Sequence, residues 1–411
     1  MFQIRWLSLH NEMHIGFISC PFTPGGAQRL VLEEIRYFRN EGYQVSAFTR
    51  EDDPSFRAEL GLGSLPTLEF PAPVAHVPSR FNRIREIGWL RSRLVDRDVD
   101  LTMSHYNDVP MYLSTRGLDI PHICHINDSP FWFADNPSLL PHSRKPGFER
   151  MMSAVDGHRH FQQPTESRPV RLYHEFREIL RLRAVRTAVL TTTIADRVAE
   201  ELSFCYGIDP KVIHPGVRED YVNRTVSASP DDIPGVETER MLLNVGRLDR
   251  RKRNALLLRA FARLVDEHER DDVTLVIVGT GRERAHLREL TSSLHIDEQV
   301  RFAGHVPEGE LPTYYAAADL FTHPAWVAYG LVPLEAYALG TEVLISTDAM
   351  VREILEGEPG VSILPPTIDA WTQAIGARLD APAEEVNRAV IPTWEEYCQK
   401  KHNRLLVHDV L

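Results

Sequence analysis

The sequence predicts an α/β protein with two domains, each a doubly wound parallel sheet. Its 411 residues exceed what one hydrophobic core usually spans. Residues 14–42 and 241–268 each combine a short apolar run, a turn and a stretch that is apolar at helical spacing. This pattern is typical of the start of a βαβ unit. Apolar runs and helical stretches then alternate along both halves of the chain.

The first half contains the strands of one sheet. A strand at 14–19 is followed by the Gly25–Gly26 turn and by a helix that ends near Gly42. The glycine pair lacks the spacing of a dinucleotide fingerprint, so it is either a structural turn or a place where a phosphate or sugar approaches the helix N-terminus. Further strands are predicted at residues 44–49, 100–105, 121–125, 188–193 and 211–217.

The second half contains the strands of another sheet, predicted at residues 241–246, 275–279, 319–323 and 342–346. A stretch rich in Ser, Pro, Asp and Gly precedes them and indicates a linker. The expected organisation is an extension at 1–12, a first domain at 13–225, a linker at 226–240, a second domain at 241–390 and a final helix at 391–411.

Composition excludes several classes of protein. The net charge of −12 argues against general affinity for nucleic acid, which needs a basic surface. The four cysteines, at positions 20, 124, 205 and 398, show no paired spacing and indicate neither a disulfide framework nor a zinc site. No run of 18 apolar residues predicts a membrane span. We therefore expect a cytoplasmic protein.

Residues 326–340 predict a loop that leads into a ligand-binding helix. Gly330 allows close approach of the backbone, and Pro333 suits the first helical position. Free N–H groups at the helix start favour an anion such as a diphosphate. Glu335 would repel that anion, so it is expected to accept hydrogen bonds from hydroxyls such as a ribose diol. The alternative is that Glu335 only caps its helix.

The loop between the predicted strand 241–246 and the following helix supports the ligand interpretation. It carries Arg247 and Lys252, five residues apart, at the edge of a parallel sheet where such folds bind ligands. Both side chains can reach one diphosphate. Arg250, Arg251 and Arg253 in the same loop are expected to be solvated surface residues.

These segments resemble the retaining family 4 glycosyltransferases of the GT-B fold. The resemblance runs from about Met13 to the C-terminus and is carried by residues 246–248, Lys252, residues 302–306 and residues 329–336. It implies two Rossmann-like domains that face a central cleft, the first on the acceptor side and the second binding the nucleotide sugar. It also implies that the final helix crosses back to the first domain.

The resemblance implies a set of site residues. Arg247 and Lys252 would hold the donor diphosphate, and Glu335 the nucleoside ribose. His125 would lie near the sugar. The remaining contacts with the donor would come from Gly25, Gly26, Gly281, His305, Val306, Gly330, Leu331 and Val332. The donor would be a UDP- or GDP-linked sugar, with no other cofactor.

One family residue is missing. The family places a second Glu eight residues before the ribose Glu, next to the donor sugar, and this chain has Val327 there. The prediction is a glycosyltransferase that acts on a hydroxyl acceptor with retention. A catalytically weakened nucleotide-sugar-binding protein or partner subunit is an alternative, and a sugar-nucleotide epimerase is a weaker one. No metal ion is predicted, because two cations and a helix N-terminus already neutralise the diphosphate.

Positive charge between residues 139 and 186 suggests an anionic partner in an otherwise acidic chain. A glycan or polyprenyl-phosphate-linked acceptor, or peripheral contact of segment 131–186 with an anionic membrane surface, would fit. Phe131, Trp132 and Phe133 would supply the apolar contacts. The alternative is a solvated helix face whose arginines pair with neighbouring glutamates.

Overall fold

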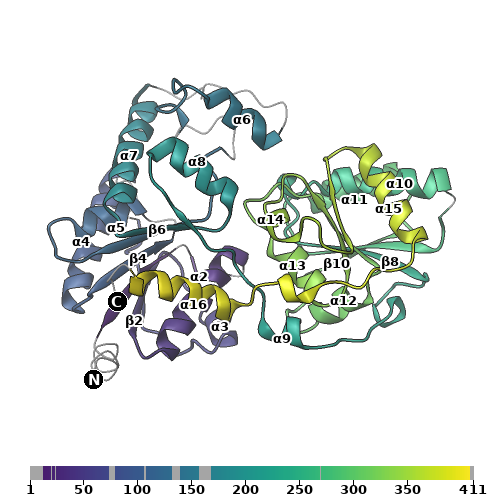
Figure 1. Ribbon diagram of the computed structural model, residues 1–411, viewed down its shortest axis with the longest axis horizontal. Helices are drawn as coiled ribbons and strands as arrows, with labels where there is room; N and C mark the ends of the chain where they lie inside the picture. The colour runs from purple at the N-terminus through teal and green to yellow at the C-terminus, as the bar shows by residue number, and fades with distance from the viewer. Residues whose placement is uncertain are drawn as a thin grey trace. The chain divides into compact units, whose positions relative to one another are not determined.

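A computed structural model describes residues 13–19, 21–23, 25–73, 79–105, 108–131, 139–156, 168–268 and 270–407. The predicted extension at 1–12, and Trp132 and Phe133, lie outside the described residues. The chain divides into two compact units. Unit 1 comprises Met1–His214 and Glu395–Leu411, and unit 2 comprises Pro215–Trp394 (Figure 1).

Unit 1 contains a parallel sheet in the order β3-β2-β1-β4-β5-β6-β7. Its central strands are short and buried throughout, as expected of a sheet covered on both faces. The order changes direction between β1 and β4, which makes the carboxyl ends of these strands the switch point of the sheet. The strands are β1 (His14–Ile18), β2 (Gln44–Thr49), β3 (Thr67–Glu69), β4 (Leu101–His105), β5 (His122–Ile126), β6 (Leu190–Thr193) and β7 (Lys211–Val212).

The helices of unit 1 place their apolar faces on this sheet. In the first of them, Leu30, Val31, Ile35 and Phe38 are buried and repeat at helical spacing. The helices are α2 (Gly26–Asn40), α3 (Pro54–Glu59), α4 (Ser79–Asp96), α5 (Asp108–Thr115), α6 (Phe148–Asp156), α7 (Arg168–Thr187), α8 (Asp196–Tyr206) and, from the end of the chain, α16 (Trp394–Val407). Figure 1 shows α16, in yellow, running beside α2.

Unit 2 contains a second parallel sheet in the order β10-β9-β8-β11-β12-β13, and its direction changes between β8 and β11. The loops that follow these two strands therefore meet at the switch point, where open α/β sheets bind ligands. The strands are β8 (Arg240–Val245), β9 (Val273–Val278), β10 (Val300–Gly304), β11 (Leu320–His323), β12 (Glu342–Ser346) and β13 (Val361–Leu364).

Helices cover both faces of this sheet, and Phe261 and Leu264 pack with Trp371 and Ile375 in its core. The longer helices are α10 (Asn254–His268), α11 (Arg284–Ser293), α13 (Leu331–Ala338) and α15 (Ile368–Asp380); the shorter elements are α9 (Glu219–Asn223), η2 (Pro230–Asp232), η3 (Arg250–Lys252), α12 (Leu311–Ala317), α14 (Arg352–Leu355) and η4 (Arg388–Val390).

The segment 226–240, expected as a linker, lies inside unit 2. Ile233 and Val236 in this segment are buried, which anchors its polar loop to the unit. Unit 2 begins at Pro215, and Val217 exchanges backbone hydrogen bonds of 2.9 Å with Pro392 and Trp394. This pairing joins the first and last residues of the unit.

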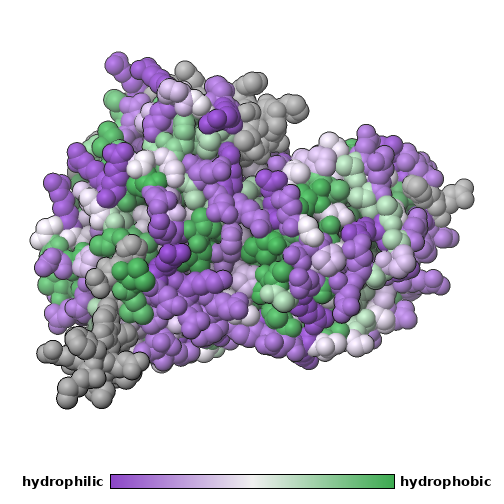
Figure 2. Space-filling view, viewed as in Figure 1, coloured by the Kyte–Doolittle hydropathy of each residue, from purple (hydrophilic) through white to green (hydrophobic). Residues whose placement is uncertain are grey.

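On the face seen in Figure 2, hydrophilic residues cover most of the coloured surface of both units, and apolar residues form small separate patches. Within the described ranges, no helix combines the length and the apolar character that crossing a membrane requires.

Candidate functional site at the switch point of unit 2

Two loops meet at the switch point of unit 2 and are hydrogen-bonded to each other. The first, residues 246–253, follows β8, and the second, residues 324–330, follows β11. The Trp326 N–H donates to the Arg251 carbonyl at 2.8 Å. The Arg253 side chain also donates to the Pro324 carbonyl at 3.4 Å, so backbone and side-chain contacts together hold the two loops in place.

Arg247 and Lys252, both from the loop after β8, differ in their surroundings. Arg247 is exposed, whereas Lys252 is half-buried. A Cβ atom on Gly246 would lie 3.4 Å from Lys252 Cε, so the lysine stem packs against the glycine. Burial lowers the pKa of Lys252 to about 8; Asp249 raises it, while Arg251 and Arg247 lower it further. A cation held in this way gains from an arriving anion.

The sequence predicts that Arg253 is a solvated surface residue, but in the structure its side chain is mostly buried. Its side chain forms an ion pair with Asp348 at 2.6 Å and is 17% exposed. Its backbone adopts a left-handed conformation with φ 51°, which ends the 3₁₀ turn η3 and directs the chain into α10. The sequence gives no sign of this turn, because arginine seldom adopts that conformation. Arg250, in contrast, is 91% exposed as expected.

Helix α13 begins at Leu331, two residues earlier than predicted from Pro333. Gly330 precedes it with φ 102°, a conformation that favours glycine, and this turn fixes the start. Pro333 is accommodated as the third helical residue, because N–H groups in the first turn have no partner within the helix. A Cβ atom on Gly330 would lie 3.2 Å from both His323 Nε2 and Val327 Cγ2. The residue at 330 must therefore be small.

Glu335 consequently lies in the second turn of α13, and the first turn holds no acidic residue. At this position Glu335 does not cap the N-terminus of α13, so the capping prediction does not apply. The Glu335 carboxylate accepts a hydrogen bond of 2.9 Å from the Tyr315 hydroxyl on α12. It is half-buried and accepts from a neutral hydroxyl, the kind of donor that a ribose also offers.

Val327 is fixed by the loop around it. Its N–H donates to the Asp348 carbonyl at 3.3 Å, and its carbonyl accepts from Met350 N–H at 3.4 Å. Two residues further on, the Tyr329 hydroxyl donates to the Pro215 carbonyl at 3.1 Å. A longer side chain at position 327 would therefore project from a supported backbone, next to Gly330.

The other predicted donor residues of unit 2 lie in the loops after β9 and β10 and in the first turn of α13. Gly281 packs so tightly that a Cβ atom there would lie 2.3 Å from the Leu248 carbonyl. The glycine is thus required by the contact between two loops, whatever binds beside it. His305 is exposed and Val306 is buried. Leu331 and Val332, half-buried, form the first turn of α13.

In unit 1, Gly25 and Gly26 follow β1 and begin α2, at the switch point of their own sheet. Gly26 is exposed and Gly25 half-buried. The atoms nearest to a Cβ atom on Gly25 would all belong to the flexible Gln28 side chain, the first at 2.4 Å. The packing within unit 1 therefore leaves room for a larger residue at 25 after a shift of Gln28.

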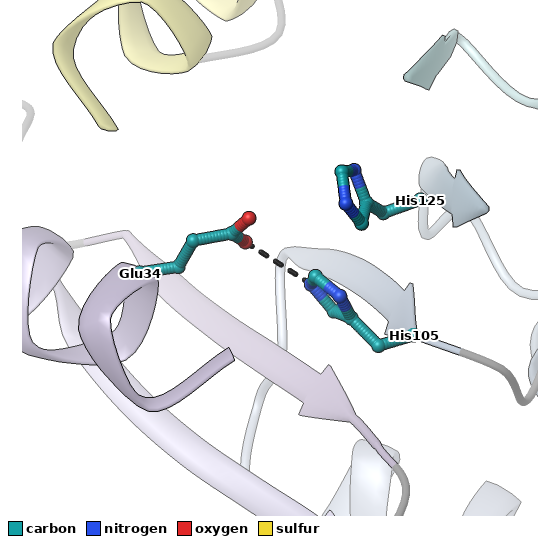
Figure 3. A group of neighbouring side chains, drawn as sticks. All are labelled: Glu34, His105 and His125. Atoms are coloured by element: carbon teal, nitrogen blue, oxygen red, sulfur yellow. Dashed lines mark hydrogen bonds and ion pairs between the residues drawn. The ribbon is translucent and has the colours of Figure 1, made fainter. Parts of the chain in front are cut away.

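His125 lies at the carboxyl end of β5, as predicted, but it is only 2% exposed. Figure 3 shows it facing His105 and Glu34. His125 Nδ1 lies 2.6 Å from the Thr192 hydroxyl, and burial lowers the pKa of the imidazole well below its usual value. Contact with a sugar or acceptor would require movement of the residues that cover it.

A lysine neutralises the buried carboxylate in this cluster. Lys401 on α16 donates to both Glu34 oxygens, at 2.6 and 2.7 Å, and both side chains are fully buried. Tyr397 donates to Glu34 at 2.5 Å, and His105 Nε2 lies 3.0 Å from the same carboxylate. Burial alone would raise the pKa of Glu34, but Lys401 and His105 together hold it well below the usual value.

The arrangement of Glu34, His105 and His125 also fits the spacing of metal ligands, because their donor atoms lie within 4.8 Å of one another. The Lys401 ammonium, however, already occupies both carboxylate oxygens. A divalent ion there would meet this positive charge at close range. We therefore assign the cluster to the attachment of α16 on unit 1.

Comparison with known proteins shows what both halves of the chain resemble. A model described as Glycosyltransferase Family 4 matches residues 24–221, and one described as Glycosyl transferases group 1 matches residues 228–390. Anabaena HepE, solved with UDP-glucose, superposes with a TM-score of 0.66 at 16% identity over 97% of both chains. The two models together match most of both units, and the chain has the fold of the GT-B glycosyltransferases. The predicted fold of two Rossmann-like parallel-sheet domains is confirmed.

Other similar proteins extend this comparison. The apo form of the lipopolysaccharide outer core galactosyltransferase WaaB has a TM-score of 0.67 at 15% identity, over 96% of this chain and 99% of its own. D-inositol 3-phosphate glycosyltransferase 2 of Catenulispora acidiphila is 30% identical over 46% of this chain and 47% of its own. The chain thus aligns with about half the length of this curated relative.

Sequence reasoning missed His323, which lies beside the switch point of unit 2. It is 1% exposed, and Gly330 lies against its Nε2, which has no hydrogen-bond partner in the described part of the chain. Burial and then the Lys252 charge lower the pKa of His323 well below its usual value. The sequence feature that could have indicated His323 is its position at the end of β11, shortly before residues 326–340.

Proposed function

We propose that this protein transfers a sugar from a nucleotide-diphospho-sugar to a hydroxyl acceptor, with retention at the anomeric carbon. The observation that carries the proposal is the meeting of the Lys252 loop with the Gly330 loop at the switch point of unit 2. Cationic side chains and a helix N-terminus lie on those two loops. The HepE structures with UDP and UDP-glucose support a donor of this class.

Each residue then has a chemical role. Arg247 and Lys252 stabilise the charge that develops on the diphosphate as its bond to the anomeric carbon breaks. The N–H groups of the first turn of α13 bind the same phosphates, and Glu335 accepts from the ribose hydroxyls. The acceptor oxygen bonds to the anomeric carbon on the face that the diphosphate leaves, and its proton passes to the departing phosphate.

A donor screen tests this proposal. UDP- and GDP-linked sugars are incubated with the protein and with sugar and lipid acceptors, and nucleotide release and the anomeric configuration of the product are measured. Acceptor-dependent release with a retained anomer is the expected result. Inversion of the anomer, or conversion of the donor sugar without transfer, would contradict it.

Val327→Glu is expected to raise the rate of transfer by about 100-fold, the scale of one electrostatic contribution to a transition state. The new carboxylate would stand beside Gly330 on a backbone that is already hydrogen-bonded, and it would face the donor sugar. Turnover of the parent and variant with the same donor gives the measurement. Val327→Gln is the control, because it has a similar size and no charge.

A nucleotide-sugar-binding protein without turnover is the second candidate, and Val327 is the observation that favours it. Such a protein would keep Arg247, Lys252 and Glu335 and would lack the carboxylate next to the sugar. Tight UDP or GDP binding, no turnover in the parent and turnover in Val327→Glu would support this candidate over the first.

The pKa of Lys252 predicts a pH dependence of binding. A lysine whose pKa is about 8 is charged below pH 8 and loses its charge above it. Affinity for UDP or GDP is therefore expected to fall about fivefold between pH 8 and 9. Titration calorimetry across this range gives the measurement. In Lys252→Arg the charge persists, so this fall should disappear; an equal fall in both proteins would contradict the assignment.

A further inference from the structure

A pocket of about 460 Å³ lies in unit 1, between helices α4, α5 and α7, and the switch-point site does not use it. Its wall is mainly apolar and its rim is cationic. The apolar lining residues are Ile84, Ile87, Val109, Pro110, Leu113, Tyr173, Phe176 and Leu180, and the charged ones are Arg50, Arg83, Asp108, Arg177 and Arg181.

Several apolar side chains around this pocket are exposed. Ile84 is 64% exposed, Phe176 is 59% and Tyr173 is 43%. Leu172 and Ile179, on the same helix as Phe176, are also exposed, at 57% and 48%. Exposed apolar groups that gather around one concavity indicate a binding surface, whereas single ones do not.

The rim of the pocket has an excess of positive charge. Glu86 accepts two hydrogen bonds from Arg50, at 2.6 and 2.7 Å, and lies 3.6 Å from Arg83. Asp108 pairs with Arg181 at 2.9 Å. Glu178 is a third carboxylate that acts on Arg181, so four arginines face three carboxylates among the residues that the structure describes.

Arg177 is the cation available to a ligand. It is half-buried on the pocket wall, and no ion pair joins it to another described residue. A half-buried guanidinium without a carboxylate partner favours a planar or tetrahedral oxyanion, with which it can form two parallel hydrogen bonds.

The place of the pocket in the fold agrees with an acceptor site. Arg50 directly follows β2, and Asp108 begins the helix after β4. Both residues therefore lie at the carboxyl edge of the sheet, the edge at which doubly wound folds bind ligands. Val109 and Pro110 follow Asp108 and extend the apolar wall of the pocket to this edge of the sheet.

We propose that this pocket holds the acceptor, and that the acceptor is a lipid phosphate whose apolar chain lies along α4, α5 and α7 while Arg177 binds its phosphate. The assignment as acceptor rests on the proposed glycosyl transfer. The binding of the lipid does not, because every residue that carries it belongs to unit 1.

Dodecyl phosphate, below its micellar concentration, is the probe for binding by titration calorimetry. Inorganic phosphate supplies the head alone, and dodecyl maltoside supplies a chain without charge. Dodecyl phosphate is expected to bind at least about tenfold more tightly than either, because only it uses both the apolar wall and the arginine. Equal binding of dodecyl maltoside, or no binding of dodecyl phosphate, would overturn the proposal.

Two variants locate the probe. Arg177→Ser is expected to weaken dodecyl phosphate binding about tenfold, and Leu113→Trp to abolish it by filling the pocket. Arg259→Ser, an exposed arginine on α10, and Val407→Trp, at a position that is 76% exposed, are the matched controls and should bind like the parent. Unchanged binding in both pocket variants would place the probe elsewhere and overturn the proposal.

Two further arms separate this proposal from others. The protein with Arg247 and Lys252 both replaced by Ala should bind dodecyl phosphate like the parent, so a failure of the donor site leaves this result intact. Sedimentation with phosphatidylcholine vesicles, with and without phosphatidylglycerol, tests a membrane surface. Binding to the anionic vesicles without binding of monomeric dodecyl phosphate would show a flat membrane contact and contradict the pocket.

Discussion

Replacing Arg247 and Lys252 together by Ala is expected to lower sugar transfer at least about 1000-fold. Both cations come from the loop after β8, and Lys252 is held half-buried against Gly246, ready to meet a diphosphate. The loss should appear in kcat as well as in KM, because the negative charge on the leaving group grows in the transition state. Steady-state nucleotide release with a donor that the parent uses gives both constants.

Arg250→Ala is the matched control for this experiment. Arg250 belongs to the same loop and has the same charge as Arg247, and it is also exposed, at 91%. Its replacement should leave transfer within about twofold of the parent, because the proposed diphosphate contacts do not include it and its exposed ion pair with Glu283 contributes little. Near-normal turnover of the double variant would show that the diphosphate is bound elsewhere.

Lys401→Met is expected to destabilise unit 1 by about 3–5 kcal/mol. It leaves the fully buried Glu34 carboxylate without the ammonium that donates to both of its oxygens. Two neighbours of the carboxylate remain: the Tyr397 hydroxyl is neutral, and burial lowers the pKa of His105, so neither replaces the ammonium charge. Urea-induced unfolding, followed by far-UV circular dichroism, measures the change in the free energy of unfolding.

A second substitution separates the buried charge from lost packing. Glu34→Gln in the Lys401→Met background removes the charge and keeps an oxygen for Tyr397, so it should recover most of the lost stability. Lys400→Met, at an exposed position next to Lys401, should unfold like the parent. If the Lys401→Met and Lys400→Met proteins unfold alike, the buried pair contributes no net stability.

The sequence predicted the two sheets well because their strands are local apolar runs. Residues 14–19 and 44–49 contain β1 and β2, and residues 241–246 overlap β8 with a shift of one residue, whereas β3, β10 and β13 were not predicted. It also placed Arg247 and Lys252 after β8, since a loop between a strand and a helix has only one place in a doubly wound sheet. These features depend on neighbours within the chain.

Contacts between distant residues could not be predicted in this way. Lys401 and Glu34 are 367 residues apart, and each alone resembles an ordinary surface charge of an amphipathic helix. The start of unit 2 at Pro215 could not be predicted for the same reason. It depends on pairing of Val217 with residues near 393, whereas composition pointed to the polar stretch that follows.

The local errors arose where backbone conformation outweighed residue preference. Proline is common at the first position of a helix, which favoured a start at Pro333. Gly330 adopts φ 102° and begins the helix two residues sooner. Arg253 adopts a conformation that the sequence would assign to glycine or asparagine, and this turn brings its guanidinium to Asp348.

The return of α16 to unit 1 sets an order of folding during synthesis. Unit 1 needs residues 395–411, and these leave the ribosome only after all of unit 2, from Pro215 to Trp394. At cellular rates that delay is roughly 10–40 seconds, during which Glu34 has no ammonium to accompany its burial. Unit 2 is continuous in the chain, so we expect the second domain to be synthesised to be the first to finish folding.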